Sequence, residues 1–475
     1  MKIFLDFYPP LSLVRQAVRQ TKRRIFLVGG AVRDYYLNRK GTDLDFAIDA
    51  KSITTSRQLA RKIKGTFVLL DREHGSARVV KNVEGTPWTF DLTDWRGATI
   101  HKDLGARDFT INALAVDLGQ DHSEVIEFKG ARRDLKAGVI RMVSSKAFKD
   151  DPLRLLRAFA LQATLGFNIE SKTQAQIKKD ISLIATVAAE RIREEIFKVL
   201  TSPRAAQTLK AMDKSGLLAQ VIPQITVMYR VHQGGYHHLD VWKHSLDVVT
   251  QLETIAQELS DDAQLQNYLN EIIGGGHSRL ALLKMAALLH DIGKPETRRP
   301  EGKRMTFHGH EHVGEGISRQ VAKQLRFSVK ERYFVENAVR MHLRPGYLAN
   351  FKVPSPKAVF RYFRDAKQEA VSLAILALAD QAATRGPLTT AARHKHHAKI
   401  CRMLIAKYFE TKVQARPKPR LLSGHDLIKA LKLKPSPLFG RILASVEEAT
   451  ALGKITTKQE ALALAREIKT KHASP

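Results

Sequence analysis

The hydrophobic pattern of the chain changes at about residue 145, and this change limits the folds that the chain can adopt. Before it, short apolar runs alternate with stretches of helical periodicity, which is typical of an α/β domain. Beyond Asp151 the pattern is helical almost throughout, with one helix expected to end at Gly166 and another expected at about 189–200. The apolar runs lie at residues 25–28, 44–48, 67–70, 77–80, 88–92 and 113–118. The sequence therefore predicts the α+β class, with a small mixed sheet and its helices followed by an all-helical remainder.

The chain is strongly basic. Its 475 residues include 78 Lys and Arg against 48 Asp and Glu, which gives a formal net charge of +30 spread along the whole chain. This excess favours a polyanionic partner, nucleic acid above an acidic protein or a membrane, although a source that favours basic proteins would also produce it. No apolar run approaches a transmembrane helix, the first residues do not resemble a signal peptide, and the single cysteine, Cys401, excludes a disulfide framework. We expect a cytoplasmic protein.

Near the start of the chain, a strand, a double glycine and a helix start are followed by two aspartates. Gly29 and Gly30 let the main chain approach a ligand, and Arg33 lies in the first helical turn, which favours phosphate binding. Asp43 and Asp45 are residues i and i+2 of the next strand, so they point to one face about 6.5 Å apart. Two such carboxylates repel each other unless a cation such as Mg²⁺ binds between them. The alternative is a solvated strand edge with two unrelated aspartates.

Five motifs follow one another in an order that identifies a family. They read GGAVRD (29–34), DLD (43–45), RDFTINALA (107–115), DDPLRLLRAFALQATLGF (150–167) and ERIREE (190–195). In order and spacing they resemble the class II tRNA nucleotidyltransferase and bacterial poly(A) polymerase family. The motifs span roughly the first 200 residues, and the rest of the chain also resembles longer members of that family.

The resemblance implies a role for each matching residue. Asp43 and Asp45 would be the catalytic pair that binds two Mg²⁺ ions, one lowering the pKa of the RNA 3′-hydroxyl and one neutralising the leaving pyrophosphate. The residues that would bind the incoming CTP or ATP are Gly29, Gly30 and Arg33 at the phosphates, Arg107, Asp108 and Asn112 at the ribose, and Asp151, Arg154 and Arg157 at the base and a nearby phosphate. Glu190, Arg191 and Glu194 match a helical motif that supports the base-reading residues.

Asp151 has a second interpretation, which the residues alone favour. It precedes Pro152, and an aspartate before a proline is a natural helix N-cap. At positions i and i+3 of a helix, Asp151 and Arg154 would also be neighbours, one able to accept from a base edge and the other to donate to it. Both roles are compatible with the same helix.

Three residues and one segment depart from the family pattern, and they bear on how the nucleotide is bound and chosen. Ala106 and Ala160 stand where arginine is usual, and Asp150 stands where glutamate is usual, which weakens the predicted grip on phosphates. The segment 91–107 is shorter than in members that add all three nucleotides of the CCA end, and it resembles enzymes that stop after two cytidines. Asp91, at its start, is a candidate third carboxylate.

Histidines and aspartates recur in order across residues 241–386. A single buried histidine is usually a satisfied core residue, but an ordered set of this kind resembles the HD phosphohydrolase superfamily. The candidate ligands of one divalent metal ion, Mn, Mg, Ni, Fe or Zn, are His244, His290, Asp291, His310, His342 and Asp380. His308 and His312 are weaker candidates that would face solvent near the site.

The remaining sequence completes four predicted parts. Residues 412–424 form a basic, proline-containing linker, and 421–465 resemble the tRNA-gripping tail of the family, although ordinary solvated helices would show the same alternation. The predicted parts are a nucleotidyltransferase head at 1–145, a helical neck with the base-recognition motif at 146–215, a helical HD-type metal domain at 216–411 and a basic helical tail at 412–475.

The resemblance implies template-independent addition of C and/or A, or of CC only, to the 3′ end of tRNA. Poly(A) synthesis is an alternative within the same chemistry. A second alternative is an HD-type metal phosphohydrolase acting on RNA 3′ ends, with the head reduced to RNA binding. A non-enzymatic RNA-binding protein would explain the charge but neither carboxylate cluster.

Overall fold

The computed structural model describes residues 2–19, 21, 23–120, 124–302, 304–414, 421–434 and 436–471. The chain forms two compact units, Met1–Val221 and Ile222–Pro475. The predicted α+β class is confirmed, because the first unit contains one mixed sheet and helices dominate the rest. The finer division into head, neck, metal domain and tail stays a prediction. Residues 415–420 of the predicted linker lie outside the described residues.

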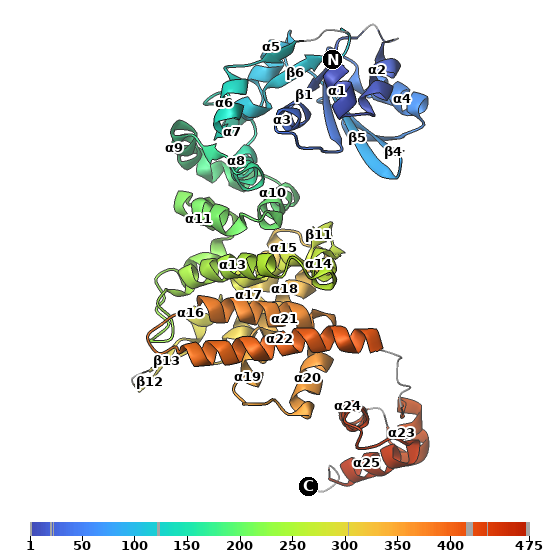
Figure 1. Ribbon diagram of the computed structural model, residues 1–475, viewed down its shortest axis with the longest axis vertical. Coiled ribbons are helices and arrows are strands. Elements are labelled where there is room, and N and C mark those ends of the chain that lie inside the picture. Colours follow the sequence, from blue (N-terminus) through green and yellow to red (C-terminus); the bar gives the residue numbers. More distant parts are fainter. Residues whose placement is uncertain are drawn as a thin grey trace. The chain divides into compact units, whose positions relative to one another are not determined.

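A seven-stranded sheet forms the centre of the first unit (Figure 1). Its strands are β1 (Ile25–Val28), β2 (Asp43–Ile48), β3 (Thr66–Asp71), β4 (Ser76–Val83), β5 (Thr86–Asp94), β6 (Leu114–Asp117) and β7 (Val125–Glu127). They lie in the order β3-β4-β5-β2-β1-β6-β7, with β2 parallel to β5 and the other neighbours antiparallel. The six apolar runs correspond to β1–β6, whereas β7 has no fully buried residue and was not predicted.

Several short helices accompany this sheet, and one of them, α5, shares an apolar core with it. They are α1 (Lys2–Phe7), α2 (Leu11–Val18), α3 (Gly30–Tyr36), α4 (Ser52–Ile63), α5 (Ile100–Gly105), α6 (Ala131–Ala137) and α7 (Ala147–Asp150), with a 3₁₀ turn η1 (Thr110–Asn112). Phe26 and Val28 of β1 are buried with Ile100 and Leu104 of α5. The segment that carries α5 is therefore anchored on β1, an inner strand of the sheet.

The rest of the first unit is helical. Its elements are α8 (Arg154–Leu165), α9 (Ser171–Asp180), η2 (Ile181–Thr186), α10 (Ala189–Thr201), α11 (Ala205–Ser215) and α12 (Leu217–Val221), with a short parallel pair β8 (Val139–Ile140) and β9 (Asn168–Ile169). Gly166 ends α8 with φ of 74°, as predicted. The start differs: α8 begins at Arg154, because Asp151 is extended and a tight turn follows it. Asp151 still caps that turn by accepting from the Leu153 N–H at 3.3 Å.

The second unit is mainly helical, but the prediction of an all-helical remainder is wrong in detail. Two short hairpins interrupt it, β10 (Ile272–Gly274) with β11 (His277–Ser278) and β12 (Arg299–Glu301) with β13 (Arg304–Thr306). Its helices are η3 (Pro223–Met228), α13 (Val241–Glu258), α14 (Ala263–Asn270), α15 (Arg279–Leu289), α16 (Lys294–Thr297), α17 (His310–Gln324), α18 (Val329–Met341), α19 (Arg344–Leu348), α20 (Pro356–Ala366), η4 (Lys367–Glu369), α21 (Ala370–Ala383), α22 (Ala391–Gln414), α23 (Gly424–Leu431), α24 (Pro437–Ala451) and α25 (Lys458–Lys471).

Two apolar helices form the centre of this unit. Nearly every described side chain of α15 and α21 is buried, which is expected of helices that are apolar on all sides. Helix α21 packs against α13, α15, α18 and α22. This arrangement brings together helix ends that are far apart in the sequence.

The last three helices have a small core of their own. Leu427 and Leu431 of α23 pack with Ile442 and Val446 of α24 and with apolar residues of α25. Helix α24 is joined to α20, because Glu448 accepts from Arg361 at 2.6 Å. Within the described residues, no helix has the length and apolar character that crossing a membrane requires.

Candidate active site and metal centre

Gly29 joins β1 to α3 in a conformation that other residues rarely adopt. Its φ is 71° and its ψ is −132°. A Cβ at this position would lie 3.1 Å from Nη1 of Arg107 and 3.5 Å from Oδ2 of Asp45. A glycine is therefore required here both by the backbone and by the two side chains that approach it.

Strand β2 presents the two predicted metal-binding aspartates on one face. Asp43 and Asp45 are solvent-accessible, whereas Leu44 and Phe46 are buried on the opposite face, as predicted. The hydroxyl of Thr89 donates to Asp43. A repelling pair of this kind, at the end of a strand beside a cavity, suits a divalent cation with oxygen ligands.

The pKa of Asp45 lies above its usual value. The main cause is the protein around the carboxyl group, which excludes water from it although its edge still reaches solvent. Arg107 and Arg157 counteract this shift, and the negative charges of Asp91 and Asp43 add to it. The nearby arginines therefore do not fully stabilise the charged form of this carboxyl group, and a bound cation would do so.

Asp91 lies directly beside Asp45, because the parallel pairing of β2 and β5 sets the two residues opposite each other. Both of its carboxylate oxygens are taken by Arg78 of β4, at 2.7 Å each. Sequence analysis missed Arg78. The signal was the hairpin turn at Glu84–Gly85, whose register places residue 78 opposite residue 91.

The motif at 107–112 forms a buried network next to these carboxylates. Asp108 accepts from the Phe109 N–H at 2.7 Å and from the Asn112 amide at 3.1 Å, and Arg157 lies 3.1 Å from it. Burial alone would raise the pKa of Asp108, but Arg157 and these hydrogen bonds hold it below its usual value. Asn112 in turn accepts from Arg33 at 2.7 Å.

The predicted base-reading residues are held by the chain itself. Arg191 of α10 donates to Asp151 at 3.1 Å. The guanidinium of Arg154 donates to the carbonyls of Ala106 at 2.9 Å and of Arg107 and Ala147 at 3.2 Å each. Arg154 therefore ties α8 to the end of the segment 91–107.

A cavity of about 210 Å³ gathers residues from four of the sequence motifs. Asp43 and Arg33, from the same motifs, are not part of its lining. The predicted residues that line it are Gly29, Gly30, Asp45, Arg107, Asp108, Asn112, Asp151, Arg154 and Arg157. The sequence therefore identified most of the polar lining of this cavity, and it missed Thr93, Asp94, Arg96 and Asp103.

Arg96 and Asp103 make hydrogen bonds within the segment 91–107. Asp103 accepts from the Arg96 N–H at 3.1 Å and from the Arg107 guanidinium at 2.9 Å. The Arg96 guanidinium donates to the carbonyl of Ala106 at 2.9 Å. The segment is thus short, and its residues from 96 to 107 are closely tied to one another.

The six predicted metal ligands of the second unit also come together. They are contributed by α13 (His244), the end of α15 (His290 and Asp291), the start of α17 (His310), the end of α18 (His342) and α21 (Asp380). They form two sets of potential ligand atoms, His244, His290 and Asp380, and Asp291, His310 and His342. Among the described residues, no other group of three or more such side chains is as tightly gathered.

The charge state of this site suits a cation. Burial, together with the neighbouring His290 and His310, lowers the pKa of His342 to about 3, so its imidazole is neutral. Burial would raise the pKa of Asp380, but the hydrogen bond from His244 and the charge of His290 hold it below its usual value. Nε2 of His290 is buried and has no hydrogen-bond partner among the described residues, as a metal ligand would. The residues therefore fit a divalent metal.

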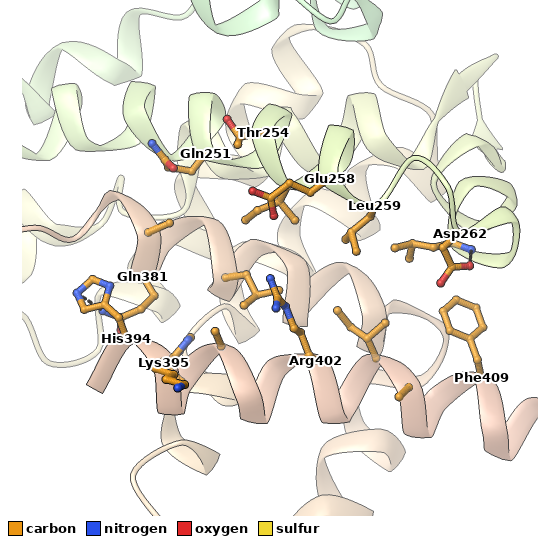
Figure 2. A pocket seen from close by; sticks show the side chains of 18 of the residues that line it. Gln251, Thr254, Glu258, Leu259, Asp262, Gln381, His394, Lys395, Arg402 and Phe409 are labelled. Carbon is orange, nitrogen blue, oxygen red and sulfur yellow. Dashed lines mark hydrogen bonds between the residues drawn. The ribbon is translucent and has the colours of Figure 1, made fainter. Parts of the chain in front are cut away.

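A further cavity, of about 920 Å³, lies between α13 and α22 (Figure 2). Gln251, Thr254 and Glu258 of α13 face it from one side, and Lys395 and Arg402 of α22 from the other. It is larger than the cavity of the first unit, but its lining is mostly apolar and includes neither the aspartate pair nor any of the six ligands. Its size therefore does not make it the active site.

Four family models match the chain in succession. They are the "Poly A polymerase head domain" at residues 25–141, the "Probable RNA and SrmB- binding site of polymerase A" at 166–228, the "HD domain" at 241–385 and a second domain of tRNA nucleotidyltransferases at 394–465. The predicted head motifs and the six histidines and aspartates fall within or beside these matches.

Relatives of known name match nearly the whole chain. The CC-adding tRNA nucleotidyltransferase of Thermus thermophilus is 33% identical over 452 residues, which cover 93% of each chain. The A-adding tRNA nucleotidyltransferase of Deinococcus radiodurans is also 33% identical, over 92% of this chain and 94% of that protein. The structure of the Thermotoga maritima CCA-adding enzyme complexed with tRNA has the same fold, with a TM-score of 0.63 at 19% identity over 99% of this chain and 98% of that chain. The chain therefore belongs to the class II tRNA nucleotidyltransferase and bacterial poly(A) polymerase family, among the members that carry an HD domain.

Proposed function

We propose that this chain is a magnesium-dependent, template-independent nucleotidyltransferase that adds C and/or A from CTP and ATP to the 3′ end of tRNA. The observation that supports this most is the cavity of the first unit, because residues from 29 to 157 converge on one small volume beside a carboxylate pair. The names of the relatives and the net charge of +30 support the same substrate.

Each group of residues has a distinct task in this proposal. Two Mg²⁺ ions bound by Asp43 and Asp45 would stabilise the charge that develops during phosphoryl transfer. Gly29, Gly30 and Arg33 would hold the triphosphate. Asp108 and Asn112 would face the ribose, together with Arg107, whose guanidinium lies next to Gly29. The base would be read by Asp151, Arg154 and Arg157.

We propose addition of two cytidines as the specificity of the site. The segment 91–107 is short, and Arg96, Asp103 and Arg154 hold it in place. Because Arg154 also belongs to the predicted base-reading set, reorienting that set from C to A would break the hydrogen bonds to Ala106 and Arg107. We therefore expect the site to accept one kind of base and not to switch from C to A. Addition of A alone is the second candidate, since an A-adding relative is as similar as the CC-adding one. Poly(A) synthesis is the third.

Three tRNA transcripts, ending before the CCA, after its first C and after CC, test this proposal. Each receives labelled CTP or ATP, singly and together, and product length is read on a sequencing gel. Addition that stops at CC is the expected result. Extension only of the transcript that ends in CC, with ATP, would make the enzyme A-adding, and a long ladder of A would make it a poly(A) polymerase. No incorporation on any transcript would overturn the nucleotidyltransferase assignment.

We propose a second activity, hydrolysis of phosphate esters at RNA 3′ ends, for the HD domain. The convergence of six predicted ligands favours it. The test is release of phosphate from transcripts that end in a 3′-phosphate, and ring opening to a 2′- or 3′-phosphate in transcripts that end in a 2′,3′-cyclic phosphate, in an Asp43→Asn, Asp45→Asn background that silences the head. Loss of this hydrolysis in His290→Ala would support the assignment, and hydrolysis that persists in His290→Ala would place the activity elsewhere.

In this proposal the four predicted parts divide the work. The head (1–145) carries the chemistry, the neck (146–215) the base recognition, residues 216–411 the metal domain and 412–475 the tRNA-binding tail. A cytoplasmic location is part of the same proposal, since tRNA and nucleoside triphosphates are the substrates.

A further inference from the structure

We propose that the groove between α13 and α22 is an interface between two copies of this chain, with α22 of each copy lying antiparallel along the groove of the other. The groove is the cavity of about 920 Å³ shown in Figure 2. The inference concerns assembly, so it does not depend on the activity proposed for either unit.

Three helices of the second unit form most of this groove. Helices α13 and α22 both pack against α21, which contributes Leu378, Gln381 and Ala382 to the lining between them. On α22 the lining extends from His394 to Glu410, a length of about 24 Å at the rise of an α-helix. The groove therefore has the length of about four helical turns, which suits a helix as its occupant.

The interior of the groove is an apolar surface that the described residues leave partly open. Ile255 and Leu259 line it from the side of α13, and Ile405 and Phe409 line it from α22. All four side chains are only partly buried. Contiguous apolar surface of this kind, with charged residues around it, is typical of a surface that contacts another protein.

The charges of the groove do not suit RNA. Three carboxylates, Glu258, Asp262 and Glu410, line it together with two cations, Lys395 and Arg402, although the whole chain has a net charge of +30. A surface that binds nucleic acid instead collects cations that face the phosphates. Both signs around an apolar centre favour a protein partner.

The charges along α22 make the groove complementary to itself. Lys395 precedes Arg402 by seven residues and Glu410 follows it by eight, which are about 11 and 12 Å along the helix axis. A twofold axis that crosses α22 near Arg402 therefore brings Lys395 of each copy to Glu410 of the other. Two ion pairs result from one symmetry operation, as in a closed dimer that uses the same surface on both copies.

Small side chains lie between these charged positions. Ala398 and Ala406 are four residues before and four residues after Arg402, and both line the groove. The same twofold axis sets Ala398 of each copy against Ala406 of the other. The distance between packed helices depends on the side chains at their contact, so alanine at both points allows the two α22 helices to approach closely.

Arg402 itself lies near the axis, where two guanidinium groups repel each other without a counter-charge. Glu258 supplies this charge, because Figure 2 shows Glu258 and Arg402 facing the groove from opposite sides. Among the described residues, neither side chain has an ion-pair partner within its own chain. Each Arg402 can therefore pair with Glu258 of the other copy.

Sedimentation velocity of the full chain, without RNA, tests whether the copies associate. We expect a monomer–dimer equilibrium in which the dimer fraction rises between about 1 and 100 µM protein. A chain that stays monomeric over this range would overturn the inference.

Charge reversals test whether the groove is the interface. Lys395→Glu and Glu410→Lys should each raise the dimer dissociation constant by at least about tenfold, because each change occurs twice and replaces attraction with repulsion. Lys399→Glu is the matched control, because Lys399 is exposed on the same helix and does not line the groove. A dissociation constant that Lys395→Glu leaves unchanged would place the interface elsewhere.

Combining the two reversals tests the antiparallel arrangement. An equimolar mixture of the Lys395→Glu and Glu410→Lys proteins should form dimers with nearly the original dissociation constant, because opposite charges meet again at both ends. The double variant should do the same by itself. Recovery also shows that both single variants are folded. A mixture that stays monomeric would contradict the arrangement.

Cross-linking tests the position of the axis. Arg402→Cys places identical thiols next to each other in the dimer, so a short bis-maleimide should join the two copies. The unchanged chain is the control, since its single cysteine, Cys401, is buried. An Arg402→Cys protein that dimerises but does not cross-link would move the axis away from this residue and overturn the assignment.

RNA is the competing occupant, and filter binding of tRNA separates the two. With the groove occupied by a second copy, Lys395→Glu should bind tRNA nearly as tightly as Lys399→Glu does. A selective loss of tRNA affinity in Lys395→Glu, in a chain that stays monomeric, would assign the groove to RNA and overturn the inference.

Discussion

The guanidinium of Arg154 donates to the main-chain carbonyl of Ala106 at 2.9 Å. Family resemblance assigns this arginine to the base edge, whereas in the structure it also secures the end of the segment 91–107. One residue therefore connects the predicted base-reading set to the segment on which the proposed specificity rests.

Replacement of Arg154 by methionine should destabilise the first unit. The change leaves three carbonyls without their donor in a largely buried position, which costs about 1–3 kcal/mol of unfolding free energy. Denaturant unfolding followed by the fluorescence of Trp88 and Trp95 measures it. Arg191→Met is the control: Arg191 is exposed and pairs with Asp151, so its loss should cost less than about 1 kcal/mol. Equal costs for the two variants would show that Arg154 is not a structural tie.

Asp43→Asn and Asp45→Asn should each abolish nucleotide incorporation. The amides keep the shape of β2 but remove the charge that the proposed Mg²⁺ ions need. Incorporation of labelled CTP measures the loss, and the affinity for tRNA, measured by filter binding, should stay nearly unchanged. Incorporation that survives in either variant would place the metal ions elsewhere.

Gly29→Ala should reduce incorporation by at least about tenfold. An alanine in this backbone conformation is strained by about 1–3 kcal/mol, and its Cβ would displace Arg107 and Asp45. Gly41→Ala is the matched control, because a Cβ at Gly41 meets no atom within 4 Å. Single-turnover rates of CTP addition compare the two. A Gly29→Ala enzyme as fast as Gly41→Ala would show that the turn adapts without cost.

Glu331→Gln should make the second unit less stable at neutral pH but not in acid. Burial alone would raise the pKa of Glu331, but hydrogen bonds from His277 and Ser328 hold it below its usual value. A lowered pKa means that the charged form stabilises the fold above about pH 4.3, and that this contribution is lost as the pH falls through the folded-state value. Glutamine can still cap α18, so only the charge changes. The difference in Tm between the two proteins, measured from about pH 6 to below about pH 4, should shrink towards zero. A constant difference would exclude the charge as its cause.

Much of the fold follows from local patterns in the sequence. The apolar runs identified β1–β6, and Gly166 marked the end of α8, because burial and glycine chemistry act over a few residues. Strand β7 was missed because its three residues are only partly buried. The hairpin β10–β11 was missed because it is held by contacts with α18, which come from distant sequence.

Site residues could be predicted where they belong to a sequence motif. They could not be predicted where their role depends on which strands and helices lie next to each other. Asp43 and Asp45 were evident from their spacing. Arg78 was not, because its role depends on the register of β4 and β5. The six histidines and aspartates of the second unit were found one by one, but their division into two sets depends on how the helices that carry them pack, and no spacing in the sequence encodes that.

Two of these histidines also end helices. His290 and His342 occupy the C-caps of α15 and α18, and each ties down a carbonyl of the last turn through Nδ1. Natural selection can therefore retain both residues for the integrity of the helical body alone. A descendant that had abandoned metal chemistry would lose Asp380 or His244 first, because neither terminates a helix. Those two positions therefore report on the history of this site more faithfully than His290 and His342.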